Sequence, residues 1–451
     1  MNTGVLDVRP AVAVAELEAA ERADPRGHSI HVCLAMAWGF LQSITNAGEA
    51  IAWGALLAFA VARLPKIWRC YRVAWRDPLW WTVVVWALWW ALAATWGPDI
   101  AGRSRVPVPE RWLLTPLILW PVMGRPWLVL GAMAVGGAVQ SAVIVVLSWD
   151  GSGWQYKLAA TGLSALSQSQ WQTATAVVLS VCAVRFGAWQ LRVIALAMLA
   201  SATLGVLILA VRTMAAGVLA GIVVALSRAM PSRRAAITRL LALSACAALG
   251  GGALLAWSPA GATLRAAFSR AADAARSGAG AEAAMRLSSA RLTLAHAAID
   301  IGARHPILGG GRGAFTAGLP QWALSKVAAD PRLREPFGPM MEGTLTDAHN
   351  AVLQAWVDGG IPAAALLCAM LVGLAVRLWR QSRTSAVAAT ALALYTVVLV
   401  NVPGGIVTAK SPGALIAVCL SISWLGLGYR VANPITCPGA LPRSRLSALY
   451  M

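Results

Sequence analysis

Long apolar segments recur along almost the whole chain, and they restrict its fold more than any other feature of the sequence. Only 12% of the residues are charged, whereas about a quarter are charged in a typical soluble domain. The apolar residues are too many for one soluble core, because such cores stop growing at roughly 250–300 residues. The sequence therefore predicts an all-α protein that crosses a membrane many times.

The apolar segments define about twelve candidate transmembrane helices, if short segments that a bundle can bury are included. They lie at roughly 30–45, 47–63, 78–97, 111–124, 127–148, 171–185, 189–211, 213–227, 237–257, 350–376, 386–403 and 412–430. Basic residues gather in the connections at 63–76, 124–126, 185–192, 227–239 and 377–383, and after Tyr429. Because cytoplasmic loops carry an excess of Lys and Arg, these connections and both chain ends are predicted to be cytoplasmic.

The segments divide the chain into five predicted regions. Residues 1–28 form a cytoplasmic tail, 29–257 carry the first nine spans, and 258–349 form one large periplasmic loop; residues 350–430 carry the last three spans, and 431–451 form a second tail. Helical spacing inside the loop predicts a helix from Ser288 to Ala303, which Pro306 ends. Tryptophans near span ends, such as Trp80, Trp81 and Trp90, are interpreted as an interfacial belt.

The net charge of +19 would point to nucleic acid in a soluble protein. Here the basic residues lie in short loops, so the expected partner is membrane lipid and no nucleic acid is predicted. The seven cysteines avoid the large loop and have no spacing typical of a metal knuckle. The sequence therefore predicts no disulfide framework, no metal site and no cofactor.

His349 is the first candidate for chemistry. It follows Asp347 at the start of a predicted span. We therefore expect it in the first helical turn, at the outer face of the membrane that the chain spans, with Thr346 or Asp347 as the cap. A helix N-terminus disfavours a charged imidazolium, and a neutral imidazole can accept a proton from a hydroxyl. Spacing alone leaves open a loop histidine that makes one hydrogen bond.

Two arginines predicted on the outer side are suited to an anionic diphosphate. Arg212 interrupts two apolar spans, where a charge is costly and is by default a functional hypothesis; snorkelling to the surface is the alternative. Arg291 lies in the predicted loop helix, where a solvated charge is the alternative. Guanidinium groups match the geometry of phosphate oxygens, which favours a diphosphate ligand for the pair.

The run from Gly309 to Gly313 reads GGGRG. Its backbone N–H groups could form an anion-binding nest, with Gly311 and Arg312 near a phosphate; a flexible turn is the alternative. No strand of a βαβ unit precedes the run, which excludes a dinucleotide-binding fingerprint. Asn350, next to His349, is a further candidate for substrate contacts.

The ordered set of motifs resembles the O-antigen ligase and polymerase superfamily of bacterial membrane glycosyltransferases. The resemblance is carried by Arg291, the run from His305 to Phe315, the pair His349-Asn350, Leu353-Gln354, Asp358 and the run Gly360-Ile361-Pro362. Arg212 matches the second arginine of the family by position, although its neighbours Val211 and Thr213 depart from the usual pattern.

The resemblance implies a multi-pass protein of the bacterial inner membrane whose active site faces the periplasm. It implies transfer of a glycan from undecaprenyl diphosphate to a hydroxyl of a glycolipid or glycan acceptor, without metal. His349 and Arg291 would be catalytic, Arg212, Arg291 and Arg312 would bind the diphosphate, and Asn350 and Gly311 would contact substrate.

Three functions stay open at this point. A ligase would use lipid A–core as the acceptor. A polymerase would join lipid-linked repeat units of O-antigen or exopolysaccharide. A polysaccharide transporter without catalysis is the third, although few ionisable residues interrupt the spans, as a transporter would require.

Overall fold

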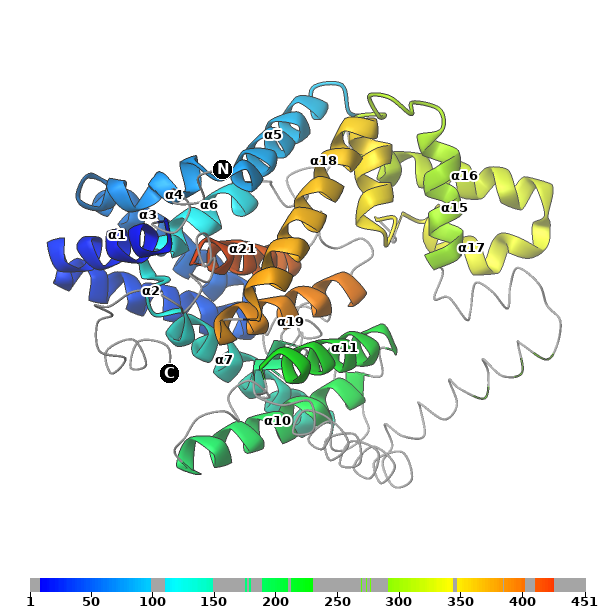
Figure 1. The fold of residues 1–451 in the computed structure, drawn as a ribbon. Coiled ribbons are helices and arrows are strands. Elements are labelled where there is room, and N and C mark those ends of the chain that lie inside the picture. Colours follow the sequence, from blue (N-terminus) through cyan, green and yellow to red (C-terminus); the bar gives the residue numbers. More distant parts are fainter. Residues whose placement is uncertain are drawn as a thin grey trace.

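The computed structural model describes residues 9–98, 110–148, 189–209, 212–229, 291–343, 347–383, 385–401 and 410–425, with isolated positions between 175 and 276. Every secondary-structure element in this part of the chain is a helix, which confirms the predicted all-α class (Figure 1). Of the predicted spans, 171–185 and 237–257 lie largely or wholly outside the described residues. The other ten coincide with helices.

In the first half of the chain, the described residues form seven α-helices and two short 3₁₀ helices. They are α1 (Arg9–Ala23), α2 (Pro25–Ile44), α3 (Asn46–Ile67), η1 (Trp68–Tyr71), α4 (Arg72–Trp75), α5 (Pro78–Ala93), α6 (Glu110–Leu119), η3 (Trp120–Val122) and α7 (Pro126–Ser148). The described second half contains α10 (Trp189–Leu209), α11 (Arg212–Ala229), α15 (Arg291–Gly302), α16 (Ala314–Ala329), η4 (Pro331–Leu333), α17 (Arg334–Met341), α18 (Ala351–Gln381), α19 (Ala386–Asn401) and α21 (Lys410–Leu425).

Three of the described helical stretches are long and apolar enough to cross a membrane: Asn46–Trp75, Pro126–Leu147 and Ala351–Gln381. Shorter apolar helices, among them α5, α19 and most of α21, accompany them. A count of twelve spans and the sides of the membrane that the loops occupy stay predictions.

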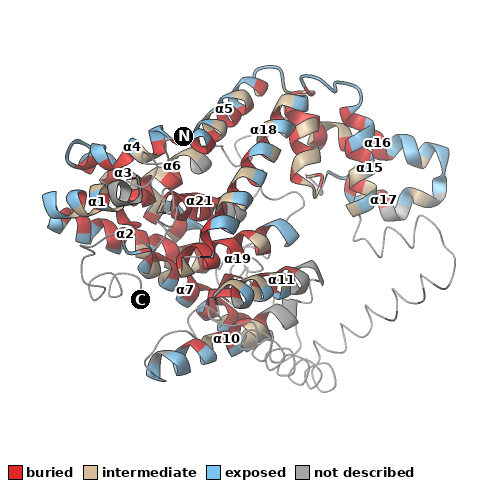
Figure 2. Cartoon of the chain, viewed as in Figure 1, coloured by how far each residue is buried: buried red, intermediate tan, exposed pale blue. Residues whose placement is uncertain are grey.

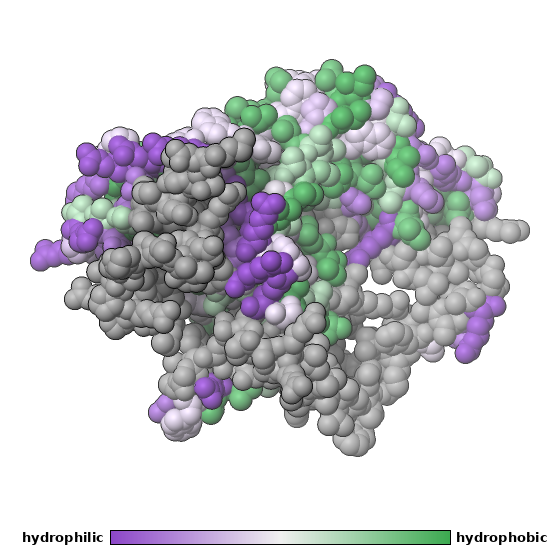
Figure 3. All heavy atoms as spheres, viewed as in Figure 1, coloured by the Kyte–Doolittle hydropathy of each residue, from purple (hydrophilic) through white to green (hydrophobic). Residues whose placement is uncertain are grey.

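Helix α5 illustrates why these helices suit a bilayer. One of its faces, with Val83, Trp86 and Trp90, is buried. Another face is apolar and exposed, and its residues follow one another at spacings of four, three and four: Trp81, Val85, Leu88 and Leu92. A helix that is apolar all round needs a non-aqueous environment on its outer face. Figure 3 shows apolar side chains over much of the visible surface near α5 and α18.

The centre of the bundle is built where α5, α6, α18, α19 and α21 meet. Helices α19 and α21 are buried over most of their length (Figure 2). Trp424 of α21 packs edge-on against Trp80 and Trp120, with ring centroids 5.6 and 5.5 Å apart. Several tryptophans that sequence position assigned to an interfacial belt, including Trp80 and Trp90, are therefore core residues with at most 2% exposure.

A buried ion pair fixes the same junction. Asp77 caps α5, where its carboxylate accepts the backbone N–H of Leu79, and it also accepts two hydrogen bonds from the guanidinium of Arg377, at 2.6 and 2.7 Å. The indole N–H of Trp424 donates to it at 2.7 Å. Because a buried carboxylate is stable only with such partners, Asp77 ties the start of α5 to the ends of α18 and α21.

The segment predicted as an N-terminal tail is partly folded onto the bundle. Residues 9–23 form α1, and Leu17 is buried. The acidic groups of this region pair with arginines from later connections: Asp24 with Arg63 at 3.0 Å, and Glu21 with Arg125. These ion pairs give a physical reason why an acidic leading segment packs against loops that are rich in arginine.

Residues 291–343, here called the loop domain, have a separate core. Its buried residues include Leu294, Ala298, Phe315, Trp322 and Met340, and the cluster also takes in Ala348 and Val357 next to and within α18. The predicted loop helix is confirmed as α15, whose described residues begin at Arg291; its predicted serine caps lie outside the described residues. The loop domain is thus joined to the bundle through α18.

Candidate active site

Helix α18 is broken at Gly360, and the break sets the direction of its first segment, which follows His349. Gly360 has φ 69° and ψ −168°, which only glycine adopts readily. The N–H of the next residue, Ile361, points at the carbonyls of Pro306 and Ile307, at 3.2 and 3.1 Å. A Cβ at position 360 would lie 2.0 Å from the Ile307 oxygen, so the first segment of α18, residues 351–359, is held against the loop domain.

The glycine-rich run packs against this break and against the end of α5. Gly309, Gly311 and Gly313 have φ of 74°, 85° and 88°. The N–H of Gly310 donates to Val357, and the N–H of Arg312 donates to Ala93. Close backbone contact therefore accounts for Gly309 and Gly311, and phosphate binding by Gly311 and Arg312 stays a prediction.

Alanine at position 311 should lower stability much more than alanine at position 343, although both glycines have positive φ. A Cβ at Gly311 would lie 2.3 Å from Cα of Gly97, whereas nothing lies within 4 Å of a Cβ at Gly343. Both variants share a left-handed backbone cost of about 1–2 kcal/mol. Thermal unfolding of the purified variants measures the difference, and equal losses would mean that the contact with Gly97 does not hold the run in place.

Asp358 links the loop domain to the start of α18. Its side chain is buried, and its carboxylate accepts the backbone N–H of Phe315 at 3.0 Å, in the first turn of α16. Its other oxygen accepts the side-chain N–H of Gln354 at 2.8 Å. The amide oxygen of Gln354 in turn accepts the backbone N–H of Ala348 at 2.8 Å. One continuous chain of hydrogen bonds thus runs from α16 to the residue before His349.

His349 lies outside the helix, which corrects the sequence prediction of a first-turn position. Asn350 is the cap instead, because its side-chain oxygen accepts the N–H groups of Val352 and Leu353. His349 has φ 47°, the one positive φ among the described non-glycine residues. Such a backbone is costly, and the flanking hydrogen bonds of Ala348 and Asn350 hold it.

Asp347 orients the imidazole of His349. Its Oδ1 lies 2.9 Å from Nδ1 of His349 and also accepts the backbone N–H of that residue at 2.9 Å. Burial alone would raise the pKa of the Asp347 carboxyl, but the hydrogen bonds and charge of His349 outweigh it and lower that pKa. With the proton on Nδ1 facing a carboxylate, Nε2 becomes the nitrogen able to accept a proton. The side chain is 38% exposed, so a substrate can reach it.

Arg291 lies at the same end of the packed helices as His349. Helix α15 and the first segment of α18 run side by side in the same direction (Figure 1). The C-terminal end of α15, at Gly302, lies against Trp356 and Val357, near the end of the first segment of α18. Arg291 and His349 therefore both lie at the other end, where the two helices begin. Burial lowers the pKa of the Arg291 guanidinium, although an arginine side chain keeps its charge in proteins.

The remaining predicted residues divide between two places. Arg212 is the first residue of α11, and only its backbone is described; the start of α11 lies on the same side of the molecule as the starts of α15 and α18 in Figure 1. Gly311 and Arg312 lie at the other end of α15, beside Gly97. Asn350 contacts its own helix as the cap.

Two residues of the arrangement received no role from sequence reasoning. Gln354 and Asp358 were noted as motif residues, but their contribution is visible only in the hydrogen bonds that join α16 to Ala348. Their i, i+4 spacing in an otherwise apolar segment is a signal that would have placed both side chains on one helix face.

A family model described as O-antigen ligase matches residues 196–368. The match covers most of α10, all of α11 and of the loop domain, and the first part of α18. It confirms the resemblance identified from the motifs and indicates a ligase- or polymerase-type function for this region. Arg212, Arg291 and His349 all lie within it. A search of curated proteins finds no match to the chain.

Proposed function

We propose, starting from the match of residues 196–368 to the O-antigen ligase family, that the protein is a membrane glycosyltransferase that uses undecaprenyl diphosphate-linked glycans. The acceptor is a hydroxyl group of a glycolipid or glycan at the periplasmic face of the inner membrane. The observation that carries this proposal is the pairing of His349 with Asp347 on a backbone held by Gln354 and Asn350.

The reaction assigned to this site is a displacement at the anomeric carbon of the donor. Nε2 of His349 takes the proton of the acceptor hydroxyl as its oxygen bonds to that carbon. The bond from the same carbon to the diphosphate oxygen breaks, and undecaprenyl diphosphate leaves. Asp347 stabilises the imidazolium that forms, as a carboxylate does in other Asp–His pairs. A single displacement of this kind inverts the anomeric configuration.

Arginine side chains stabilise the negative charge that develops on the leaving diphosphate. Arg291 is suited to this role because it is partly buried, where a charge acts more strongly than in water, and because it lies at the His349 end of α15. Arg212, at the start of α11, is proposed as a second cation. Arg312 and Gly311 are proposed to contact a phosphate, and Asn350 is proposed to contact the substrate. This scheme uses no metal and no other cofactor.

The membrane part of the protein would hold the polyprenyl chain. Three candidate spans and the apolar outer face of α5 provide a surface for lipid, and a donor anchored there presents its diphosphate near the membrane boundary. A ligase acting on lipid A–core is our first assignment. A polymerase that joins lipid-linked repeats uses the same chemistry with another acceptor, and a transporter without catalysis has no use for the Asp347–His349 pair.

A deletion strain distinguishes these assignments through the pattern of its surface glycolipids on a gel. For a ligase we expect loss of all capped lipopolysaccharide and accumulation of lipid-linked polymer. A cap of a single repeat would indicate an O-antigen polymerase, and unchanged lipopolysaccharide with loss of secreted polymer would indicate an exopolysaccharide enzyme. Complementation with Arg291→Ala should fail, while Arg291→Lys, which keeps the charge without the fork, should restore part of the product. Unchanged glycans in every fraction would refute the proposal.

A further inference from the structure

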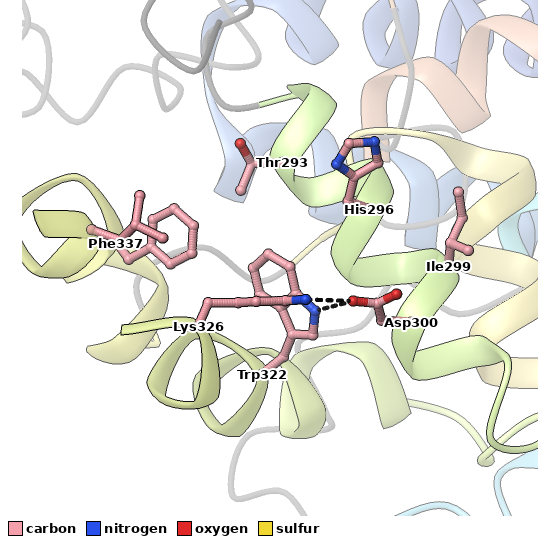
Figure 4. Close-up of a pocket in the computed structure, with 8 residues that line it drawn as sticks. Thr293, His296, Ile299, Asp300, Trp322, Lys326 and Phe337 are labelled. Carbon is pink, nitrogen blue, oxygen red and sulfur yellow. Dashed lines mark hydrogen bonds and ion pairs between the residues drawn. The ribbon is translucent and has the colours of Figure 1, made fainter. Parts of the chain in front are cut away.

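The loop domain contains a cavity that the proposed chemistry does not use. It has a volume of about 390 Å³ and lies between α15, α16 and α17 (Figure 4). Sites for small ligands typically measure about 300–1,000 Å³. The cavity is therefore large enough for a bound group of the size of a sugar residue.

One wall of the cavity is the face of α15 that carries Thr293, His296 and Asp300. These residues are spaced three and four apart, so their side chains share one side of the helix. His296 and Asp300 are exposed, and Thr293 is partly exposed. The wall thus offers a hydroxyl, an imidazole and a carboxylate to a ligand.

The opposite wall is aromatic and rigid. Trp322 of α16 stacks on Phe337 of α17, with centroids 5.6 Å apart and planes 15° apart, and each is only 5% exposed. The indole N–H of Trp322 donates to Asp300 at 2.8 Å, and the ammonium of Lys326 lies 3.2 Å from the same oxygen. Figure 4 shows these two contacts converging on one carboxylate oxygen, which leaves the other oxygen directed away from both donors.

The chemistry of these walls fits a hydroxyl-rich ligand better than an anion. Asp300 and Lys326 cancel in charge, so the cavity has no cationic excess of the kind a phosphate requires. The hydrogen bond from Trp322, together with Lys326, lowers the pKa of Asp300, so the carboxylate is an acceptor at neutral pH. Sugar hydroxyls both donate and accept hydrogen bonds, and Ile299 and Phe337 provide apolar surface for the C–H faces of a sugar ring.

The cavity lies on the side of α15 that faces away from Arg291. Thr293 follows Arg291 by two residues, about 200° around a helix of 3.6 residues per turn, and Asp300 lies about 10 Å further along the helix at 1.5 Å per residue. Helix α15 therefore separates the cavity from the proposed diphosphate site, so a sugar linked directly to the diphosphate would not reach the cavity and only a longer glycan would.

We propose that this cavity is a saccharide subsite, which binds a sugar residue of an oligosaccharide substrate away from the reacting carbon. The proposal rests on the proposed function. The same chemistry suits a sugar of the donor glycan or of the acceptor glycan, and the length of each substrate can be varied separately.

The test uses the full-length protein in proteoliposomes and the double variant Thr293→Ala/His296→Ala. With a donor that carries several sugars, we expect KM to rise about tenfold, as the loss of two hydrogen bonds predicts, and kcat to stay unchanged. With a donor that carries a single sugar, KM should stay unchanged. If the increase in KM follows the length of the acceptor instead, the subsite belongs to the acceptor glycan.

A second readout does not depend on catalysis. Oligosaccharide released from the lipid carrier by mild acid should bind to the wild-type protein in saturation-transfer NMR, and the double variant should bind it about tenfold more weakly. Ser325→Ala, an exposed change on α16 outside the cavity, is the matched control and should behave as the wild type. Equal binding and equal KM in wild type and double variant would overturn the subsite. A failed function would show itself differently, as transfer that survives in His349→Ala.

Discussion

Replacement of His349 by asparagine is expected to lower the rate of glycan transfer by at least about 100-fold, because a general base contributes roughly 10²–10⁴-fold. Asparagine cannot take a proton from a hydroxyl, but, like histidine, it tolerates the left-handed backbone better than most non-glycine residues. The strained φ of 47° can therefore persist, so the loss reports chemistry rather than folding. Initial rates in proteoliposomes with a lipid-linked glycan donor measure the effect.

Two further variants make the result specific. His305→Asn changes a histidine at the far end of α15, in the turn before the glycine run, and should keep full activity. His349→Ala should lose as much activity as His349→Asn and also lose some stability, since alanine pays the left-handed cost of about 1–2 kcal/mol. Full transfer by the asparagine variant would exclude His349 as the base.

Replacement of Asp358 by alanine is expected to destabilise the protein by about 3 kcal/mol, the cost of leaving buried donors without an acceptor. The change removes the acceptor for the N–H of Phe315 and for the side chain of Gln354. It also frees the chain of hydrogen bonds that ends at Ala348, so transfer should fall as well. Thermal unfolding in detergent, with and without added lipid, measures the loss.

The comparison with Gln354→Ala separates the two roles of Asp358. That variant keeps the contact between Asp358 and α16 but removes the acceptor for the N–H of Ala348. We expect a smaller loss of stability, about 1–2 kcal/mol, together with a clear fall in kcat at nearly constant KM, because the imidazole is no longer held. If Gln354→Ala transfers glycan at the wild-type rate, the hydrogen-bond chain does not position His349.

The helical class and the places of the helices follow from the sequence, since apolar segments bounded by turn and cap residues carry that information locally. The predicted span at 78–97 is one example, because Asp77 caps α5 directly before Pro78, where that span begins. The predicted boundary at His349 was wrong because Asp347 and Asn350 are both suitable residue types for the cap of this helix. Asn350 provides two hydrogen bonds to the first turn, and Asp347 is used by His349 instead.

Features that depend on distant partners were not predictable in this way. A tryptophan near the end of a span can face lipid headgroups or a neighbouring helix, and Trp80 is buried in contact with Trp424, which lies far along the chain. Asp358 reads as a charge in an apolar segment until α16 is placed next to it. The candidate base and Arg291 were found from motifs, whereas the residues that hold the base required the structure.

The break at Gly360 has a mechanical consequence. The same helix provides a candidate membrane span on one side of the break and the support of His349 on the other. Backbone hydrogen bonds from Ile361 make the join stiff, so a change in the tilt of the span moves the imidazole with it. A mismatch between bilayer thickness and the length of the span biases that tilt, and the acyl-chain length of the surrounding lipids would therefore alter turnover without any lipid touching the reacting atoms.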